Sequence, residues 1–230
     1  MTALPRVFDK RLIVLTGNYG SGKTELALNL ALRFAETGSV TLVDLDIVNP
    51  YFRSGEKAGM LRAAGVRVLM PTFALSTVDI PALPAEIQSV FELPCDRVIF
   101  DVGGDDTGAA ALGRYAPSFG RERDNVLTAL VVNAMRPLTQ NAGDVAELAA
   151  RIASRGRLPI DLLINNTNLA DRTDADMLRR GEAVVREAAG LLGVGATLTA
   201  GTAELLDQCP ECAGRVEIRR FMAPEWMEDA

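Results

Sequence analysis

The chain has 230 residues, of which 48% are hydrophobic and 23% charged, so it can bury a sizeable core and is not a disordered chain. Its formal net charge of −6 makes free nucleic acid and anionic membranes poor default partners. It contains no histidine, which excludes nucleophile systems with a histidine base and all histidine metal sites. Any proton transfer falls to carboxylates, lysine, tyrosine or water.

The N-terminal region and the cysteine content indicate a cytoplasmic protein. Residues 1–15 carry charges close to a short apolar strand and lack the long apolar stretch and cleavage site of a signal peptide. No run approaches the ~18 apolar residues that span a bilayer. Three cysteines, an odd number, do not resemble a secreted disulfide framework. We expect no membrane partner.

Short apolar runs rich in Val, Ile and Leu alternate with helical patterns along the chain. The predicted strands are Leu12–Thr16, Val40–Asp46, Val66–Met70, Val98–Asp101, Leu127–Asn133, Leu162–Asn165 and Ala196–Ala200. The predicted helices are Lys23–Thr37, Gly55–Ala64, Pro84–Phe91, Pro137–Ser154 and Asp174–Leu192. This alternation predicts an α/β domain with a mainly parallel sheet covered by helices. We expect one domain over residues 1–230, with the tail after about residue 215 as a peripheral extension.

A phosphate-binding motif follows the first strand and opens the first helix. Its residues match the pattern G-x-x-x-x-G-K-[ST] and are Gly17, Asn18, Tyr19, Gly20, Ser21, Gly22, Lys23 and Thr24. Glycines let the main chain approach the phosphates, and amide N–H groups at the helix start converge on their oxygens. Lys23 supplies a charge to the β- and γ-phosphates, and the Thr24 hydroxyl binds Mg²⁺. The motif predicts binding of ATP or GTP with Mg²⁺.

Acidic residues end two other predicted strands. Asp101 ends an apolar strand and begins the pattern D-x-x-G, so we expect it to hold Mg²⁺ directly or through water. The N–H of Gly104 is a candidate sensor of the γ-phosphate. Asp44 and Asp46 lie on the same side of the second strand. Asp46, nearer the carboxyl end, is the candidate that positions the attacking water or the metal shell, and Asp44 is the candidate that braces the helix. Lys23, Asp46 and Asp101 are therefore the catalytic candidates, and Thr24, Asp46 and Asp101 the metal ligands.

These three elements together resemble the SIMIBI branch of P-loop proteins, which includes MinD, ParA and the CobQ/CobB nucleotide-binding domains. Residues 43–53, with the sequence VDLDIVNPYFR, resemble an uncharacterised subgroup of that branch. The resemblance implies a three-layer αβα fold with seven or eight mainly parallel strands. It also implies ATP binding and a homodimer that closes face to face around the nucleotide.

Asn18 departs from the MinD and ParA pattern, which has a second lysine at this position. An amide does not supply the positive charge that stabilises the transferring phosphoryl group, so we expect slow hydrolysis. Arg53 is a candidate for compensating this charge in cis or in trans, although an exposed structural arginine is the more ordinary interpretation.

The strand that ends at Asn165 resembles the strand that contacts the base in this family, which implies a base contact for Asn165. The four positions that correspond to the N-K-x-D motif of GTPases read N-N-T-N here. Asn168 has one acceptor oxygen where the carboxylate of GTPases has two, so the sequence favours ATP over GTP.

The two C-terminal cysteines, Cys209 and Cys212, form a single C-x-x-C motif. Two thiolates do not complete a four-coordinate metal site, although two subunits of a dimer could supply four. A pair of thiols in a turn is the more ordinary interpretation, so an iron–sulfur cluster or zinc is not expected.

Four functions remain open from the sequence. The first is an ATPase or nucleotide switch of the MinD/ParA-like kind. The second is an ATP-dependent small-molecule kinase or ligase of the CobB-like kind, with an acceptor pocket lined by residues 72–84 and Asp79. The third is a dimeric metallocentre assembly factor that uses Cys209 and Cys212. The fourth is a nucleotide sensor without turnover.

Overall fold

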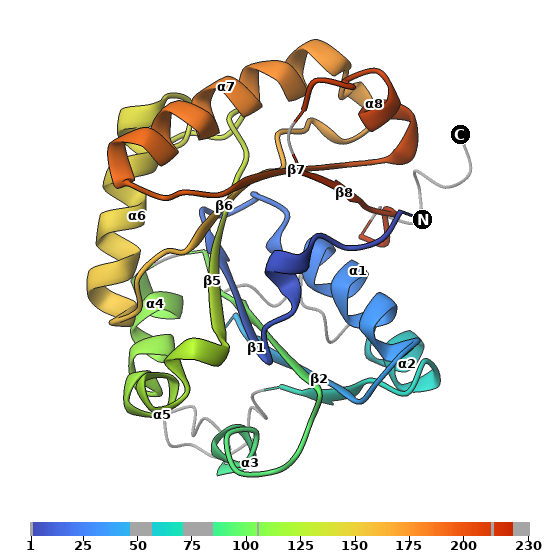
Figure 1. Cartoon of the computed structure of the whole chain (residues 1–230), viewed down its shortest axis with the longest axis vertical. Helices are drawn as coiled ribbons and strands as arrows, with labels where there is room; N and C mark the ends of the chain where they lie inside the picture. Colours follow the sequence, from blue (N-terminus) through green and yellow to red (C-terminus); the bar gives the residue numbers. More distant parts are fainter. Residues whose placement is uncertain (1, 47–56, 71–84, 105, 213, 223–230) are drawn as a thin grey trace, which may run out of the picture.

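The computed structural model describes residues 2–46, 57–70, 85–104, 106–212 and 214–222. Within these residues, eight strands form one sheet in which every neighbouring pair is parallel. The strands are β1 (Leu12–Gly17), β2 (Val40–Leu45), β3 (Arg67–Leu69), β4 (Arg97–Val102), β5 (Val126–Val132), β6 (Leu162–Asn165), β7 (Thr197–Gly201) and β8 (Arg215–Glu217). Their order across the sheet is β3-β2-β4-β1-β5-β6-β7-β8, which places β1 near the centre (Figure 1).

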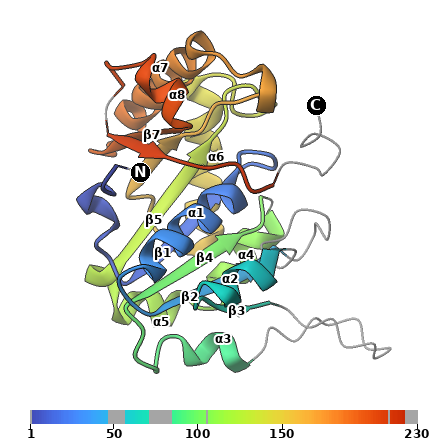
Figure 2. The ribbon, with the colours of Figure 1, turned by 90° about the vertical axis from the view of Figure 1, so that its right-hand side faces the viewer.

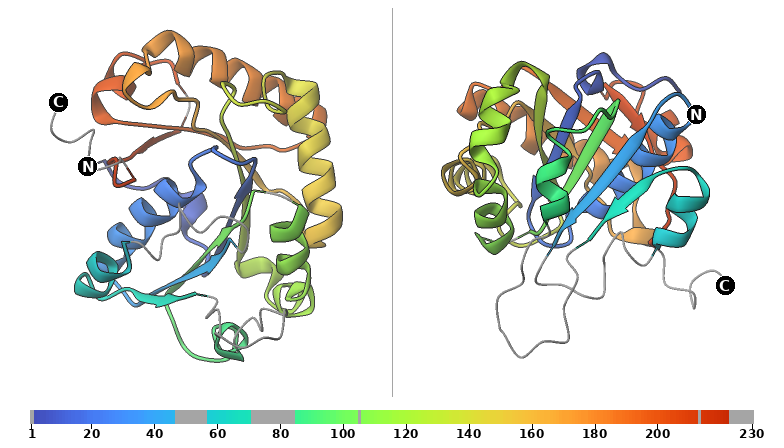
Figure 3. Two further views of the ribbon diagram at one scale, coloured as in Figure 1. Left: turned by 180° about the vertical axis from the view of Figure 1, so that it is seen from behind. Right: turned by 90° about the horizontal axis from the view of Figure 1, so that it is seen from below.

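Helices cover both faces of this sheet. They are α1 (Lys23–Ala35), α2 (Ala58–Ala63), α3 (Ala85–Ser89), α4 (Asp106–Gly113), α5 (Ala116–Arg121), α6 (Ala142–Gly156), α7 (Ala175–Leu192) and α8 (Ala203–Asp207). Figure 2 shows α1 and α2 in front of the strands. Figure 3 shows α4, α5 and α6 on the opposite side. The expected three-layer α/β fold with a parallel sheet is confirmed.

Burial of the strands on both faces explains why their sequences do not alternate. In β1, Ile13 and Leu15 pack in the core on the α1 side, whereas Leu12 and Val14 pack in the core that contains Phe100. All six residues of β1 are buried. Apolar side chains are therefore needed at successive positions, which is typical of a central parallel strand.

Helix α6 begins five residues later than the sequence pattern predicts. It starts at Ala142 because the side chain of Asn141 caps it by accepting the N–H of Asp144 at 2.9 Å. The preceding residues form a turn instead, in which Thr139 Oγ1 donates to the main-chain oxygen of Asn133 at 2.7 Å. Short elements such as α4 and β8 are also absent from the prediction, since α4 consists mainly of small residues without an apolar stripe.

The chain after β8 packs along helix α1. Main-chain groups of Arg219 exchange hydrogen bonds with the side chain of Asn29 at 2.7 and 2.8 Å. The carboxylate of Glu25 accepts the N–H groups of Phe221 and Met222 at 2.6 and 3.1 Å. Residues 215–222, expected to be a peripheral extension, thus add a strand to the sheet and then line the site described below.

Among the described residues, no helix has both the length and the hydropathy that crossing a bilayer requires.

Candidate functional site

The loop between β1 and α1 folds into a cradle at the carboxyl edge of the sheet. Gly20 and Gly22 have φ values of +70° and +85°, a backbone region that side chains disfavour. Gly22 is the N-cap residue of α1, so the positive end of this helix lies at the cradle. Lys23 is buried, and its Nζ donates to the main-chain oxygen of Asn18 at 2.8 Å.

Side chains from three other segments hold the cradle in shape. Asn166 Nδ2 donates to the main-chain oxygen of Ser21 at 2.8 Å. Asn18 Nδ2 donates to the main-chain oxygen of Pro137 at 2.6 Å. Asn133 Nδ2 donates to the main-chain oxygen of Gly20 at 3.4 Å. Because these bonds fix the loop without a ligand, little ordering entropy remains to be lost when a ligand binds.

Two acidic strands meet beside the cradle. Asp44 on β2 and Asp101 on β4 are neighbours in the parallel register, and both are buried. Asp44 Oδ1 accepts the N–H of Asp46 at 2.9 Å, so Asp44 braces the end of its strand. Asp46 lies further along, at the wall of the adjoining cavity. The structure thus brings Asp46, Asp101 and the loop to one place.

Asp101 is buried next to the first turn of α1. Its Oδ2 atom is buried and has no hydrogen-bond partner among the described residues. Burial is the largest effect that raises the pKa of Asp101, and the negative charge of Asp44 is the next, so the pKa is about 7. The hydrogen bond from Thr24 and the charge of Lys23 act in the opposite direction. A buried carboxylate oxygen without a partner is a group that a cation would satisfy.

The oxygen atoms beside Asp101 fit a magnesium ion. The Thr24 hydroxyl and the Asp101 carboxylate supply the hard oxygen ligands that Mg²⁺ prefers. The described residues contain no group of three or more His, Cys, Asp or Glu able to hold a metal. A magnesium ion here would therefore need waters or phosphate oxygens as further ligands, which is how Mg²⁺ binds in phosphoryl-transfer sites.

Gly104 packs directly against the phosphate cradle. A Cβ atom at this position would lie 2.5 Å from the main-chain nitrogen of Tyr19 and 2.8 Å from the main-chain carbon of Asn18. Both atoms belong to the backbone of the loop, so they have little room to move. The turn after β4 is thus in close contact with the phosphate-binding loop at Gly104.

We expect Gly104→Ala to lower the free energy of unfolding by about 1–3 kcal/mol, because the added methyl group overpacks the loop backbone. Gly59→Ala in α2 is the matched control: its Cβ would meet no atom within 4 Å, and alanine favours helix by up to about 1 kcal/mol. Urea unfolding of both variants measures the difference. Equal stability of the two variants would contradict the packing argument.

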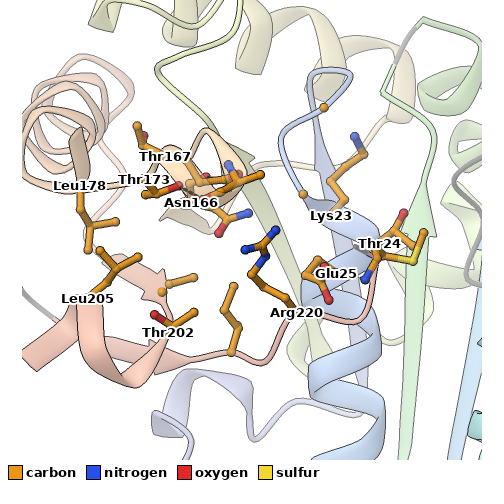
Figure 4. A pocket seen from close by; sticks show the side chains of 18 of the residues that line it. Lys23, Thr24, Glu25, Asn166, Thr167, Thr173, Leu178, Thr202, Leu205 and Arg220 are labelled. Atoms are coloured by element: carbon orange, nitrogen blue, oxygen red, sulfur yellow. Dashed lines mark hydrogen bonds between the residues drawn. The ribbon is translucent and has the colours of Figure 1, made fainter. Parts of the chain in front are cut away.

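A cavity of about 810 Å³ extends from the cradle toward β7 and the C-terminal segment. Figure 4 shows Lys23 and Thr24 at one end, Leu178 and Leu205 at the other, and Arg220 between them. Arg220 forms an ion pair with Asp171, and both line the cavity. Its other lining residues include Asp46, Arg136, Asn166, Thr167, Asn168, Thr173, Ala200, Thr202, Gln208, Ile218 and Met222. A volume of this size and an apolar far end suit a small organic ligand.

The structure places Asn165 outside this cavity. Asn165 is fully buried, its Nδ2 donates to the main-chain oxygen of Leu178 at 2.9 Å, and its Oδ1 accepts the N–H of Thr167 at 3.1 Å. The amide therefore joins β6 to α7. The neighbouring Asn166 and Asn168 line the cavity instead. The amides in this run are alike in sequence, and only the packing of α7 distinguishes them.

Several residues of the site do not stand out in the sequence. They are Glu25, Asn133, Arg136, Asn166 and Arg220. The position of Asn133 directly after β5 is a usable signal, because ligands bind at the carboxyl ends of parallel strands. The predictions for residues 47–53, which include Arg53, and for residues 72–84, which include Asp79, concern residues outside the described part of the chain.

Cys209 and Cys212 lie in a small apolar cluster formed with Leu178 and Leu206. Both are buried, with exposed fractions of 0% and 5%. Burial, followed by a hydrogen bond with Glu182, raises the pKa of the Cys212 thiol to about 12. Cys212 is therefore held as a neutral thiol, and both cysteines pack with Leu178, which lines the cavity.

Solved structures resemble this chain over most of its length. The 54 kDa signal recognition particle protein of Aeropyrum pernix K1, in complex with GDP, has a TM-score of 0.52 and 25% identity over 83% of this chain and 42% of its own. FtsY of Mycoplasma mycoides has a TM-score of 0.54 and 16% identity over 81% and 58%. FtsY of Thermotoga maritima has a TM-score of 0.53 and 18% identity over 90% and 65%.

The fold is that of SIMIBI-class P-loop NTPases. The chain spans between 42% and 65% of the length of these three structures, so it corresponds to a part of each. No protein-family model matches the chain, and no curated protein matches it.

Proposed function

We propose that this chain is a Mg²⁺-dependent ATP-binding protein that acts as a slow ATPase or nucleotide switch of the MinD/ParA-like class. The observation that carries this proposal is the cradle of residues 17–24, with Lys23 inside it and Thr24 beside the buried carboxylate of Asp101. A cavity large enough for a nucleoside adjoins the cradle. We propose a cytoplasmic protein that forms a homodimer, as the resemblance to MinD and ParA implies.

Residues within the cradle and beside it have distinct roles in this proposal. The N–H groups at the start of α1 and the ammonium of Lys23 bind the phosphate oxygens. Thr24 and Asp101 would hold a magnesium ion, which would neutralise charge on the transferred phosphoryl group. Asp46, at the cavity wall, orients the attacking water. The Gly104 N–H, at the turn packed on the loop, senses whether a γ-phosphate is bound.

The side chain of Asn18 supports slow rather than fast hydrolysis. Its amide is already used within the fold, because Nδ2 donates to Pro137 and Oδ1 accepts the N–H of Tyr19 at 2.8 Å. An amide is neutral, and these bonds hold it within the fold, so it supplies no charge to a phosphate of its own subunit or of a partner. Transition-state charge on the phosphoryl oxygens would be stabilised less than where a lysine stands at this position.

The loop after β6 supports adenine over guanine. Guanine recognition by GTPases needs a carboxylate that accepts two N–H groups. Asn168 Nδ2 donates to the main-chain oxygen of Asn166 at 2.7 Å, and its Oδ1 accepts the N–H of Ala170 at 3.3 Å. The carboxylate that follows, Asp171, is paired with Arg220. Because of these bonds, neither the Asn168 amide nor the Asp171 carboxylate is expected to accept both N–H groups of guanine.

Calorimetric titration of the purified chain with ATP and with GTP, each with and without Mg²⁺, tests the proposal. We expect ATP to bind more tightly than GTP, Mg²⁺ to strengthen the binding, and turnover to be slow. Absence of binding by both nucleotides would overturn the function, and tighter binding of GTP would overturn the base assignment. ADP release that requires an added metabolite would favour the kinase or ligase instead.

A further inference from the structure

Arg136 contacts the phosphate cradle, although it belongs to a different part of the chain. It stands in the turn between β5 and α6, and its Nε donates to the main-chain oxygen of Gly20 at 3.3 Å. A Cβ added at Gly20 would lie 3.0 Å from this Nε atom, so the absence of a side chain there leaves room for the guanidinium. Arg136 lines the same cavity as Lys23.

The turn that carries Arg136 is held in place by buried polar side chains. Asn133 and Thr139 are both fully buried. Asn133 Oδ1 accepts the N–H of Met135 at 3.0 Å, and Thr139 Oγ1 donates to the main-chain oxygens of Asn133 and Arg136 at 2.7 and 3.1 Å. Leu138 has a φ of +65°, an unfavourable conformation for leucine. The fold therefore maintains a strained turn at this edge of the cradle.

The same turn is tied to the loop through its main chain and side chains. Asn18 in the loop donates to Pro137, which directly follows Arg136. Asn133 donates both to Gly20 and, at 3.0 Å, to the main-chain oxygen of Asn168. The position of Arg136 is thus fixed relative to the phosphate-binding loop and to the loop that borders the far part of the cavity.

Arg136 is a cationic side chain at the cavity wall, and its hydrogen bond in the described residues is to the main chain of Gly20. Among the residues that the structure describes, Lys23, Arg136 and Arg220 are the cationic residues that line the cavity. Arg220 is paired with Asp171. Among the ion pairs of the described residues none involves Arg136, and its hydrogen bond to Gly20 uses Nε. Its two terminal nitrogens therefore keep the planar fork that recognises phosphate oxygens in a bidentate manner.

We propose that Arg136 is a second cationic ligand of the bound polyphosphate, acting from the turn between β5 and α6. This inference rests on the proposed function, since it assumes that a nucleotide occupies the cradle. Two terminal N–H groups of Arg136 bind oxygens of the β- and γ-phosphates, while its Nε–H stays bonded to Gly20. Arg136 thereby discriminates nucleotides by their number of phosphates and does not contact the base.

Titration of the native chain and of Arg136→Gln with ATP, ADP and AMP, in the presence of Mg²⁺, tests this role. We expect Arg136→Gln to weaken ATP binding by about 10- to 100-fold, as loss of charged hydrogen bonds predicts. AMP affinity should change by less than about twofold, because AMP lacks the phosphates that Arg136 binds. Arg136→Lys should recover part of the ATP affinity, since lysine keeps the charge without the fork.

Arg114→Gln is the matched control, because Arg114 is exposed between α4 and α5 and does not line the cavity. It removes the same charge and should leave all three affinities unchanged. Circular dichroism and thermal unfolding without nucleotide check that the variants fold. We expect them to fold because the side chain of Arg136 is exposed. If Arg136→Gln does not fold, selective loss of ATP affinity in Arg136→Lys is the test.

Two results would overturn the inference while the proposed function stands. One is ATP binding by Arg136→Gln within about twofold of the native chain. The other is an equal loss of ATP and AMP affinity, which would assign Arg136 to loop structure or to the base. If the native chain binds none of the three nucleotides, the proposed function itself fails and the role of Arg136 falls with it.

Discussion

Lys23→Ala is expected to lower the affinity for Mg²⁺–ATP by about 100-fold or more, because two charged hydrogen bonds to phosphate oxygens are lost. The nucleotide-free chain should melt within a few degrees of the native protein. Lys23 is 6% exposed, and removing a buried ammonium group also removes its cost of desolvation. Calorimetric titration and differential scanning calorimetry measure the two effects separately.

Lys10→Ala provides the matched control for this variant. Lys10 donates from Nζ to the main-chain oxygen of Asp124 on the exposed surface and does not line the cavity. Its replacement removes the same side chain and should leave ATP affinity unchanged. Retention of native ATP affinity by Lys23→Ala would show that residues 17–24 are not the phosphate site, whatever their sequence pattern.

Asp101→Asn is expected to abolish the strengthening of ATP binding by Mg²⁺ and, at the same time, to stabilise the metal-free protein at pH 8. The first effect follows because an amide is a poor substitute for a carboxylate ligand of a hard cation. The second follows because a buried carboxylate beside Asp44 is costly to ionise. Titration with ATP at several Mg²⁺ concentrations measures the first effect, and urea unfolding in EDTA the second.

The raised pKa of Asp101 also determines how the free energy of unfolding changes with pH. The pKa is about 7 in the folded chain and near 3.8 in the unfolded chain, so the folded state holds the extra proton between these values. Stability from this group is complete below about pH 4 and is lost as pH rises to about 7, at up to about 1.4 kcal/mol per pH unit. Asp101→Asn should remove this decrease of the free energy of unfolding with rising pH.

Asp96→Asn is the control for the pH experiment. The N–H and hydroxyl of Ser39 donate to Asp96 and hold its pKa below the usual value. Its contribution to stability is therefore complete above the unfolded pKa and is lost on acidification, the opposite direction from Asp101. Between pH 5 and pH 8 this variant should keep the native slope. An unchanged slope in Asp101→Asn would contradict the assignment of the proton to Asp101.

The sequence by itself determined the architecture and the central part of the site. Residues 12–35 form a strand, a loop and a helix in one contiguous stretch. The phosphate-binding motif and the apolar periodicity of the helix can therefore both be recognised from neighbouring residues. Apolar strands without alternation require burial on both faces, which predicts the parallel sheet. Asp46 and Asp101 were predictable neighbours of the loop because the carboxyl ends of parallel strands share one edge of the sheet.

Only the tertiary structure decided which distant residues complete the site. Arg136 is hydrogen-bonded to Gly20, which is 116 positions away in the sequence, and Phe221 is hydrogen-bonded to Glu25, which is 196 positions away. No local periodicity encodes such contacts, since they arise when separate strands end at the same edge of the sheet. The choice of Asn166 over Asn165 as a cavity residue was settled in the same way, because helix α7 takes up the amide of Asn165. The sequence identifies the functional group that each residue carries, whereas the access of that group to a ligand depends on the residues that pack against it.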